Sequence, residues 1–182
     1  MYYFVVLLRI ISAPLIFIWP LPAIILSFFL DVIDIEFASR KVLTLSEYER
    51  YDKALDLWWY FNVMAFSWFH LPNYRFLLLV LFILRTVGEI IFFLKNDRRI
   101  FFLFPNFFEN IFFLIFFSIY FRQLNFLLDR KFMFFSLSVV IIGKIFQEWW
   151  VHIAQISIPE HFFGKKRIFL SSITLSFPLE SL

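Results

Sequence analysis

The sequence predicts an all-α, polytopic integral membrane protein with about six transmembrane helices. Two observations predict this fold class. Hydrophobic residues make up 62% of the 182 residues and charged residues only 17%, whereas a soluble domain is about half apolar and about a quarter charged. The apolar residues also gather into long runs that short polar segments separate. One water-soluble core cannot bury so much apolar surface, but lipid can surround it.

The expected helices follow from the interruptions of the apolar runs. The first run is too long for one span, and Trp19-Pro20-Leu21-Pro22 divides it, because paired prolines break a helix. We expect helices at about 2–19, 22–40, 48–70, 74–95, 100–121 and 132–156 and a cytoplasmic tail at 157–182, in a single transmembrane domain. Ser46 and Glu49 form a capping-box pattern near the start of the third helix, and Leu71-Pro72-Asn73 ends it. The polar residues 122–131 are expected to form a loop.

Composition excludes several classes of site. The chain has no cysteine, so disulfides, thiol nucleophiles and thiolate metal sites are absent. With only 3 glycines, it has no glycine-rich phosphate loop. The net charge of +3 is too small for a nucleic-acid-binding surface, and we expect no nucleic-acid partner. Lysine and arginine concentrate in one set of loops, which predicts a multi-pass topology with both termini on the cytoplasmic side.

Four of the chain's aspartates fall into two close pairs in the second and third expected helices. They are Asp31, Asp34, Asp52 and Asp56. Members of a pair are three or four residues apart and share one helix face, so two antiparallel helices bring all four to one polar, cytoplasmic site. Carboxylates so close repel one another, and oxygen ligands suit Mg²⁺, Mn²⁺ or Ca²⁺. The alternative is that Arg40, Lys41 and Lys53 neutralise them without a metal.

The spacing of these aspartates resembles the signature of the CDP-alcohol phosphotransferases, D-x2-D-G-x2-A-R-x8-G-x3-D-x3-D. All four aspartates and Ala38 are in register. Ile35 and Tyr48 stand at the two glycine positions, and Ser39 stands at the arginine position, with Arg40 one residue later. The resemblance covers residues 31–56, and the other expected helices agree with the family only in number and length.

The resemblance implies that a phosphatidyl or similar phosphoryl-alcohol group is transferred from a CDP-linked donor to an alcohol acceptor in phospholipid synthesis, within a homodimer in contact with membrane lipid. It implies two Mg²⁺ or Mn²⁺ ions held by Asp31, Asp34, Asp52 and Asp56. Asp56 would also deprotonate the acceptor hydroxyl. The implied nucleotide-binding positions are Ile35, Ala38, Ser39 and Tyr48. Arg9 and Arg40 are candidates for a lipid phosphate, and the alternative for Arg9 is an ion pair with the aspartates.

Two further functions stay open. The substituted motif positions are also compatible with a non-catalytic descendant of that family, a structural or lipid-binding membrane protein. A third possibility is an ion or metal carrier that uses the aspartates with Glu89, Glu109 and Glu148. Arg85 with Glu89, and Lys144 with Glu148, are i,i+4 pairs that satisfy themselves within one helix. Glu109 has no opposite charge in its own helix, so we expect Arg85 or Lys144 as its partner.

Overall fold

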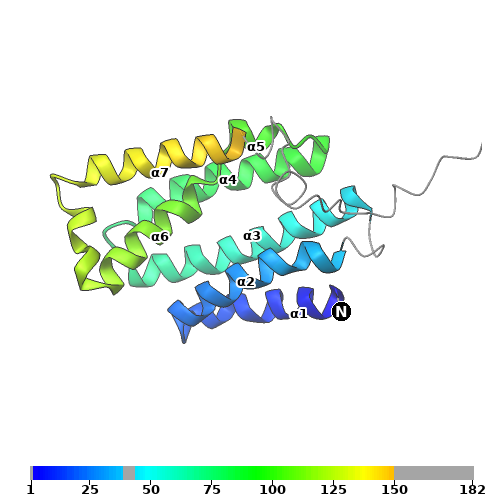
Figure 1. Ribbon diagram of the computed structural model, residues 1–182, viewed down its shortest axis with the longest axis horizontal. Helices are drawn as coiled ribbons and strands as arrows, with labels where there is room; N and C mark the ends of the chain where they lie inside the picture. Colours follow the sequence, from blue (N-terminus) through cyan, green and yellow to red (C-terminus); the bar gives the residue numbers. More distant parts are fainter. Residues whose placement is uncertain (1, 39–43, 150–182) are drawn as a thin grey trace, which may run out of the picture. The chain divides into compact units, whose positions relative to one another are not determined.

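The computed structural model describes residues 2–38 and 44–149, and the regular structure in these ranges is entirely helical (Figure 1). The all-α class is therefore confirmed. The described residues fall into two units, one ending at Asn62 and the other beginning at Val63. Among the described helices, α4 (Arg75–Lys95) is the one that is long and apolar enough to cross a membrane. The polytopic membrane topology stays a prediction.

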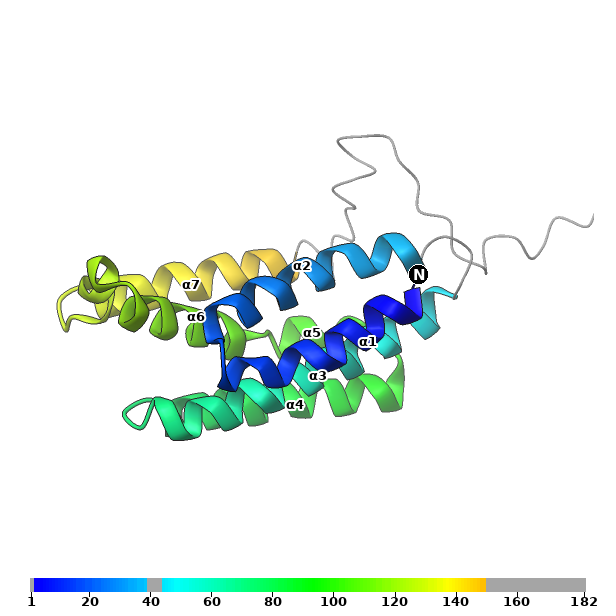
Figure 2. The same ribbon diagram turned by 90° about the horizontal axis from the view of Figure 1, so that it is seen from below.

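The first unit contains α1 (Tyr2–Ser12), the 3-10 helix η1 (Ala13–Phe17), α2 (Pro20–Ala38) and the first part of α3 (Leu45–His70). Figures 1 and 2 show α1 and α2 side by side and running in opposite directions. The expected break between the first two helices is found at Ile18 and Trp19, and α2 already begins at Pro20, because proline is tolerated in the first turn of a helix.

The helix expected at 2–19 is interrupted, and Pro14 explains the change. Proline has no N–H, so the carbonyl of Ile10 loses its α-helical donor and the chain tightens into η1. The indole Nε1 of Trp58 in α3 donates to that carbonyl at 3.0 Å. A side chain of α3 thus replaces the hydrogen bond that Pro14 removes from the first helix.

The capping box of α3 lies two residues earlier than expected. Thr44 donates to the Glu47 carboxylate from its backbone N–H at 2.9 Å and from its hydroxyl at 2.7 Å. The N–H of Glu47 in turn donates to the Thr44 hydroxyl at 3.2 Å. The expected cap at Ser46 and Glu49 is therefore wrong, because both lie inside the helix that this earlier box starts. The two bonds from Thr44 hold the pKa of Glu47 below its ordinary value.

The second unit contains the rest of α3, α4, α5 (Ile100–Leu103), α6 (Phe107–Tyr120), the 3-10 helix η2 (Arg122–Leu128) and α7 (Met133–Glu148). The end of α3 at His70 and the extent of α4 agree with the sequence-based prediction. Asn96 ends α4 in the left-handed conformation, with φ 54°. The polar segment 122–131 is not a simple loop, since η2 occupies most of it.

The single helix expected at 100–121 is wrong, because the chain leaves the helical conformation at Phe104. Pro105 cannot donate a backbone hydrogen bond and disfavours helical geometry in the residue before it. Phe104 accordingly has φ −123° and ψ 66°. The side chain of Asn106 then accepts from the N–H of Glu109 at 3.2 Å and caps the new helix α6.

Buried polar side chains satisfy the backbone at this break. Arg85 pairs with Glu89 at 3.1 Å and donates to the carbonyl of Phe104 at 3.2 Å. Glu148 pairs with Lys144 at 3.0 Å and accepts from the backbone N–H of Asn106 at 3.3 Å. The two expected i,i+4 ion pairs are thus confirmed. One member of each pair also hydrogen-bonds the backbone at the break: Arg85 of α4 bonds Phe104, and Glu148 of α7 bonds Asn106.

Asn106 also provides the contact to Glu109 that the sequence did not indicate. Its side-chain amide donates to the Glu109 carboxylate at 2.9 Å. The expected ion pair of Glu109 with Arg85 or Lys144 stays a prediction, while each of these two cations contacts the acid four residues further along its own helix. Glu109 belongs to a helix cap, which exists only because the chain breaks at Pro105.

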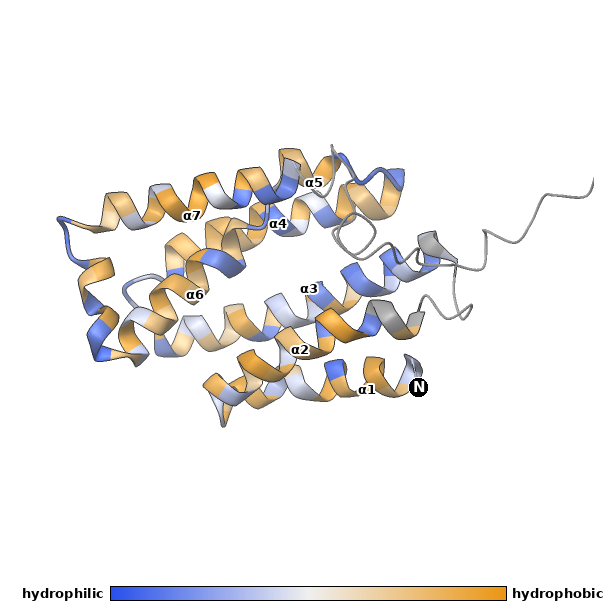
Figure 3. Cartoon of the chain, in the orientation of Figure 1, coloured by the Kyte–Doolittle hydropathy of each residue, from blue (hydrophilic) through white to orange (hydrophobic). Residues whose placement is uncertain are grey.

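The surface of the described helices is strongly apolar. Exposed large hydrophobic side chains outnumber buried hydrophobic residues, and they include Val80 and Leu94 of α4 and Phe134 and Phe135 of α7. Figure 3 shows hydrophobic residues along most of α4, α6 and α7. Leaving one such side chain in water rather than in an apolar environment costs about 1.5–3 kcal/mol. The outer surface is therefore poorly suited to water.

Candidate metal centre

The first unit brings all four motif aspartates to one place, around the guanidinium group of Arg9. Arg9 comes from α1, and its side chain is only 7% exposed. One terminal nitrogen lies 2.9 Å from a carboxylate oxygen of Asp31 and 2.8 Å from one of Asp56. The other nitrogen lies 3.1 Å from Asp52 and also contacts Asp34. The expected convergence of the four carboxylates is therefore found, and a guanidinium group lies among them.

The spacing of the aspartates along the two helices explains this convergence. Asp31 and Asp34 are one turn apart on α2, and Asp52 and Asp56 are one turn apart on α3, so each pair projects from a single face. Apolar packing holds the neighbouring ends of the helices. Tyr2 of α1 and Tyr48 of α3 form a small buried core, against which Val6 and Phe37 pack.

Three of the four carboxylates form a group that could hold a metal ion. One oxygen from each of Asp31, Asp52 and Asp56 lies within 4.8 Å of the other two. Two ligands of one ion can be no more than two bond lengths apart, which is about 4.2 Å for Mg²⁺ and about 5 Å for Ca²⁺. Small side-chain rotations therefore suffice to place the three oxygens around a single divalent cation.

Asp34 has the least exposed side chain of the four aspartates, at 1%. Like Asp52 and Asp56, it has a partner at each of its two carboxylate oxygens. The hydroxyl of Tyr48 donates to one oxygen at 2.9 Å, and Arg9 donates to the other. Asp34 contacts Arg9 and Tyr48, and it lies outside the group of three aspartates whose oxygens are close enough to share a metal ion.

Lys53 is the second cation of the cluster among the described residues. Its ammonium nitrogen lies 2.7 Å from Asp52 and 2.6 Å from Asp56. Arg9 and Lys53 therefore offset part of the negative charge that the four carboxylates can carry. Carboxylate oxygens are also the ligands that Mg²⁺ and Mn²⁺ prefer.

The remaining predicted residues divide into three groups. Tyr48 is at the site, but it contacts Asp34 with its hydroxyl, a role that its place at a motif glycine did not indicate. Ile35 and Ala38 lie on α2, and their side chains are outside the described part of the structure. Ser39 and Arg40, with Lys41, lie outside the described residues altogether, so their proposed contacts stay predictions.

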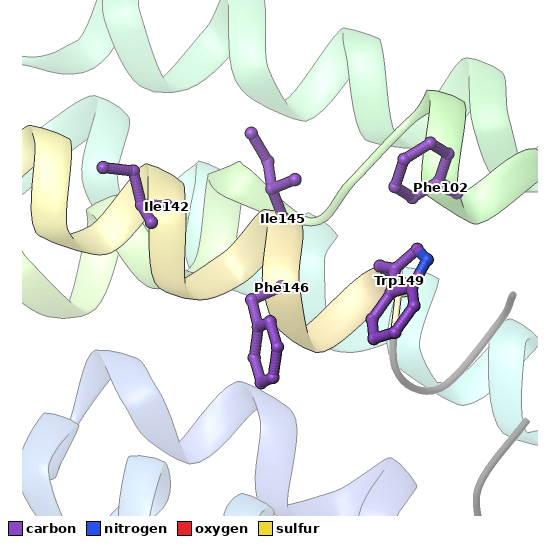
Figure 4. Close-up of a pocket in the computed structure, with 5 residues that line it drawn as sticks. All are labelled: Phe102, Ile142, Ile145, Phe146 and Trp149. Atoms are coloured by element: carbon purple, nitrogen blue, oxygen red, sulfur yellow. The ribbon is translucent and has the colours of Figure 1, made fainter. Parts of the chain in front are cut away.

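The second unit has an apolar pocket of about 330 Å³, lined by Phe102, Ile142, Ile145, Phe146 and Trp149 (Figure 4). The five side chains come from α5, from α7 and from the residue that follows α7. None of them is titratable or a ligand for a hard cation. The pocket therefore adds no chemistry of its own.

Comparison with known proteins adds no relative to this picture. No protein-family model, curated protein sequence or solved structure matches the chain.

Proposed function

We propose that this protein is a membrane-embedded, metal-dependent phosphotransferase that resembles the CDP-alcohol phosphotransferases. It would move a phosphatidyl or similar phosphoryl-alcohol group from a CDP-linked donor to an alcohol acceptor. The observation that carries the proposal is that the four aspartates in the family's register gather at one point in the fold. Sequence spacing and three-dimensional geometry thus indicate the same site.

The membrane location has its own support. α4 is long and apolar enough to span a bilayer, and the described helices expose an apolar surface that water solvates poorly. The distribution of lysine and arginine favours a multi-pass topology with both termini and the aspartates on the cytoplasmic side, where CDP-linked donors would be available. The same resemblance suggests a homodimer.

The chemistry follows from the groups in the cluster. The acceptor hydroxyl oxygen attacks the donor phosphorus, the bond from phosphorus to the CMP oxygen breaks, and CMP leaves with that electron pair. Asp56 takes the hydroxyl proton. Bound Mg²⁺ or Mn²⁺, of which the resemblance implies two, would neutralise charge on the donor phosphates. Asp56 contacts Arg9 at 2.8 Å and Lys53 at 2.6 Å, so both cations position the carboxylate that serves as the base.

A second candidate is a non-catalytic descendant that keeps the helices and the metal group. One observation favours it. Tyr48 stands where the family motif has glycine, is buried, and has its hydroxyl bound to Asp34. A tyrosine in place of glycine takes up room that a nucleotide would use. The two candidates therefore differ in whether the protein binds a cytidine nucleotide.

The experiment that separates them is the thermal stability of the purified full chain in detergent, with Mg²⁺ or Mn²⁺ and with CDP or CMP. A ligand that binds only the folded state raises the unfolding temperature. Stabilisation by nucleotide only when metal is present supports the transferase. Stabilisation by metal alone supports the non-catalytic descendant. No response to either ligand refutes the metal centre.

The role of Asp56 needs its own variant. We expect Asp56→Asn to abolish CMP release from a CDP-linked donor, because asparagine cannot accept the hydroxyl proton. Asp129→Asn is the matched control, since Asp129 is exposed and lies in the second unit. Undiminished turnover in Asp56→Asn would show that another group acts as the base.

A further inference from the structure

We infer that one end of the second unit lies at a membrane surface and binds the phosphate groups of anionic phospholipids. This end is formed by the turn between α3 and α4 and by η2 with the residues that lead into α7. Figures 1 and 2 show both segments where α4 and α7 begin and α6 ends. The rings of Phe66 in α3 and Phe116 in α6 are 6.3 Å apart, so the ends of these two helices lie close together. The inference rests on the proposed membrane location but not on the proposed transfer reaction.

The charged side chains at this end are mostly basic. Residues 71–76 and 121–132 carry one acidic residue, Asp129, and four basic residues, which gives a net charge of +3. The basic residues, called the basic end below, are Arg75, Arg122, Arg130 and Lys131. In the part of the chain that the structure describes, no carboxylate forms an ion pair with any of the four. The basic end can therefore bind an anion from outside the chain.

Arg75 is held by aromatic rings. Its guanidinium carbon lies 5.1 Å from the ring centroid of Trp68 and 5.0 Å from that of Phe76. The side chain makes no hydrogen bond to another described residue. A guanidinium group presents paired N–H donors that match the oxygens of a phosphate. The two rings thus orient a cation whose terminal donors suit a phosphate ligand.

The length of α4 places the basic end at the depth of lipid phosphates. α4 has 21 residues, of which Arg75 is the first and Lys95 the last. At about 1.5 Å per residue, the helix covers about 30 Å, which is the thickness of the hydrocarbon core of a bilayer. A spanning α4 therefore has one basic residue in each headgroup layer.

Tryptophan and tyrosine mark the same boundary. Within residues 63–149 these side chains occur only near helix ends, whereas the long apolar stretches of α4, α6 and α7 contain phenylalanine instead. Three of the four lie at the basic end, and the fourth follows α7 at the opposite end: Trp68, Tyr74, Tyr120 and Trp149. Tryptophan and tyrosine are typical of the layer where a membrane protein meets the lipid headgroups. Two independent features thus place the basic end in that layer.

The test measures the unfolding temperature of the purified full chain in detergent while phosphatidylglycerol, which is anionic, or phosphatidylcholine, which is zwitterionic, is added. We expect phosphatidylglycerol to raise the unfolding temperature more, and added salt to reduce the difference, because salt screens exposed charges. Inorganic phosphate should have a smaller effect, because it has no acyl chain to contact the apolar helices. Equal effects of the two lipids would overturn the inference, as would an inorganic phosphate effect as large as that of phosphatidylglycerol.

Variants locate the binding. A basic residue near an anionic membrane surface strengthens binding about fivefold, or about 1 kcal/mol. Arg75→Gln should therefore raise the phosphatidylglycerol concentration for half-maximal stabilisation about fivefold, whereas Arg75→Lys, which keeps the charge, should change it less. Replacing Arg122, Arg130 and Lys131 together by glutamine should raise it further.

The matched control is Arg50→Gln, which removes an equal charge from an exposed position in the first unit and should leave this concentration unchanged. An equal loss in Arg50→Gln and Arg75→Gln would show that only total charge matters, which overturns the inference. If Arg75→Gln does not fold, the wild-type comparison of the two lipids and the η2 variant still decide. The response to metal and nucleotide is read in the same assay without added lipid, so the proposed function stands or fails separately.

Discussion

The two helical glycines of the described chain, Gly88 in α4 and Gly143 in α7, provide a matched test of the packing at the chain break. Replacing Gly88 with alanine would place a Cβ atom within 3.0 Å of both the Cβ and the Cγ of Phe104. Real Cβ atoms essentially never approach so closely. Around Gly143, a new Cβ meets nothing within 4 Å. The same chemical change thus meets opposite surroundings.

The expected magnitudes follow from two terms. Glycine in a helix interior costs about 1 kcal/mol relative to alanine, so both substitutions gain this amount. Gly88→Ala also meets a clash that cannot relax easily, because the Cβ of Phe104 is fixed by its backbone, and overpacking of this kind costs about 1–3 kcal/mol. Moving Phe104 away would further weaken the 3.2 Å hydrogen bond from Arg85 to its carbonyl. Gly143→Ala should therefore be the more stable variant by about 1–3 kcal/mol.

The measurement is the apparent unfolding temperature of each purified variant in the same detergent. For a chain of this size, 1 kcal/mol shifts the midpoint by about 2–4 °C. We expect Gly143→Ala above wild type and Gly88→Ala clearly below Gly143→Ala. Because the helix-propensity gain cancels between them, their difference reports the contact with Phe104. Equal or inverted stabilities would refute the close approach of α4 to the break.

Three further substitutions test single contacts through the same unfolding temperature. Thr44→Ala should cost about 1 kcal/mol by removing the N-cap of α3. The bonds from Thr44 hold the pKa of Glu47 below its ordinary value, so the part of the effect that comes from the hydroxyl bond to Glu47 should be present above pH 4.5 and shrink as the pH falls below it. Trp58→Phe should cost about 0.5–1.5 kcal/mol by removing the indole donor, and the cost should be smaller in a Pro14→Ala background, where the backbone can supply the missing N–H. Arg85→Met should cost about 3–5 kcal/mol, because it leaves Glu89 buried without that cation, and Arg85→Met with Glu89→Leu should recover most of the loss. Equal losses in the single and double variants would contradict the last expectation.

The sequence predicted the elements that depend on regular spacing. Aspartates three and four residues apart lie on one face of any α-helix, so their convergence required only two antiparallel neighbours. The ion pairs of Arg85 and Lys144 with the acids four residues on were predictable for the same reason. The sequence indicates that Arg9 needs an anionic partner, but spacing alone does not decide whether that partner is the aspartate cluster or a lipid phosphate.

The sequence predicted less well where a local break changes the partners of a residue. The apolar run predicts that Pro105 lies near the start of one long helix, whereas in the structure Pro105 ends one helix and Asn106 caps the next. Thr44 and Ser46 both satisfy the first position of a capping box, and pattern alone does not choose between them. The hydrogen bond from Tyr48 to Asp34 depends on how α2 and α3 pack, which no spacing within one helix reveals.

The ion cluster around Arg9 also has a consequence for how the chain enters a bilayer. An arginine or an aspartate at the centre of an inserting helix costs about 2.5–3.5 kcal/mol on translocon-derived scales. During synthesis, Arg9 emerges before any of its four carboxylates. In the proposed topology, α1 is therefore a poor membrane anchor by itself. We expect its stable insertion to wait until α2 and α3 arrive, so that the first three helices leave the translocon as one group in which the carboxylates neutralise the charge of Arg9.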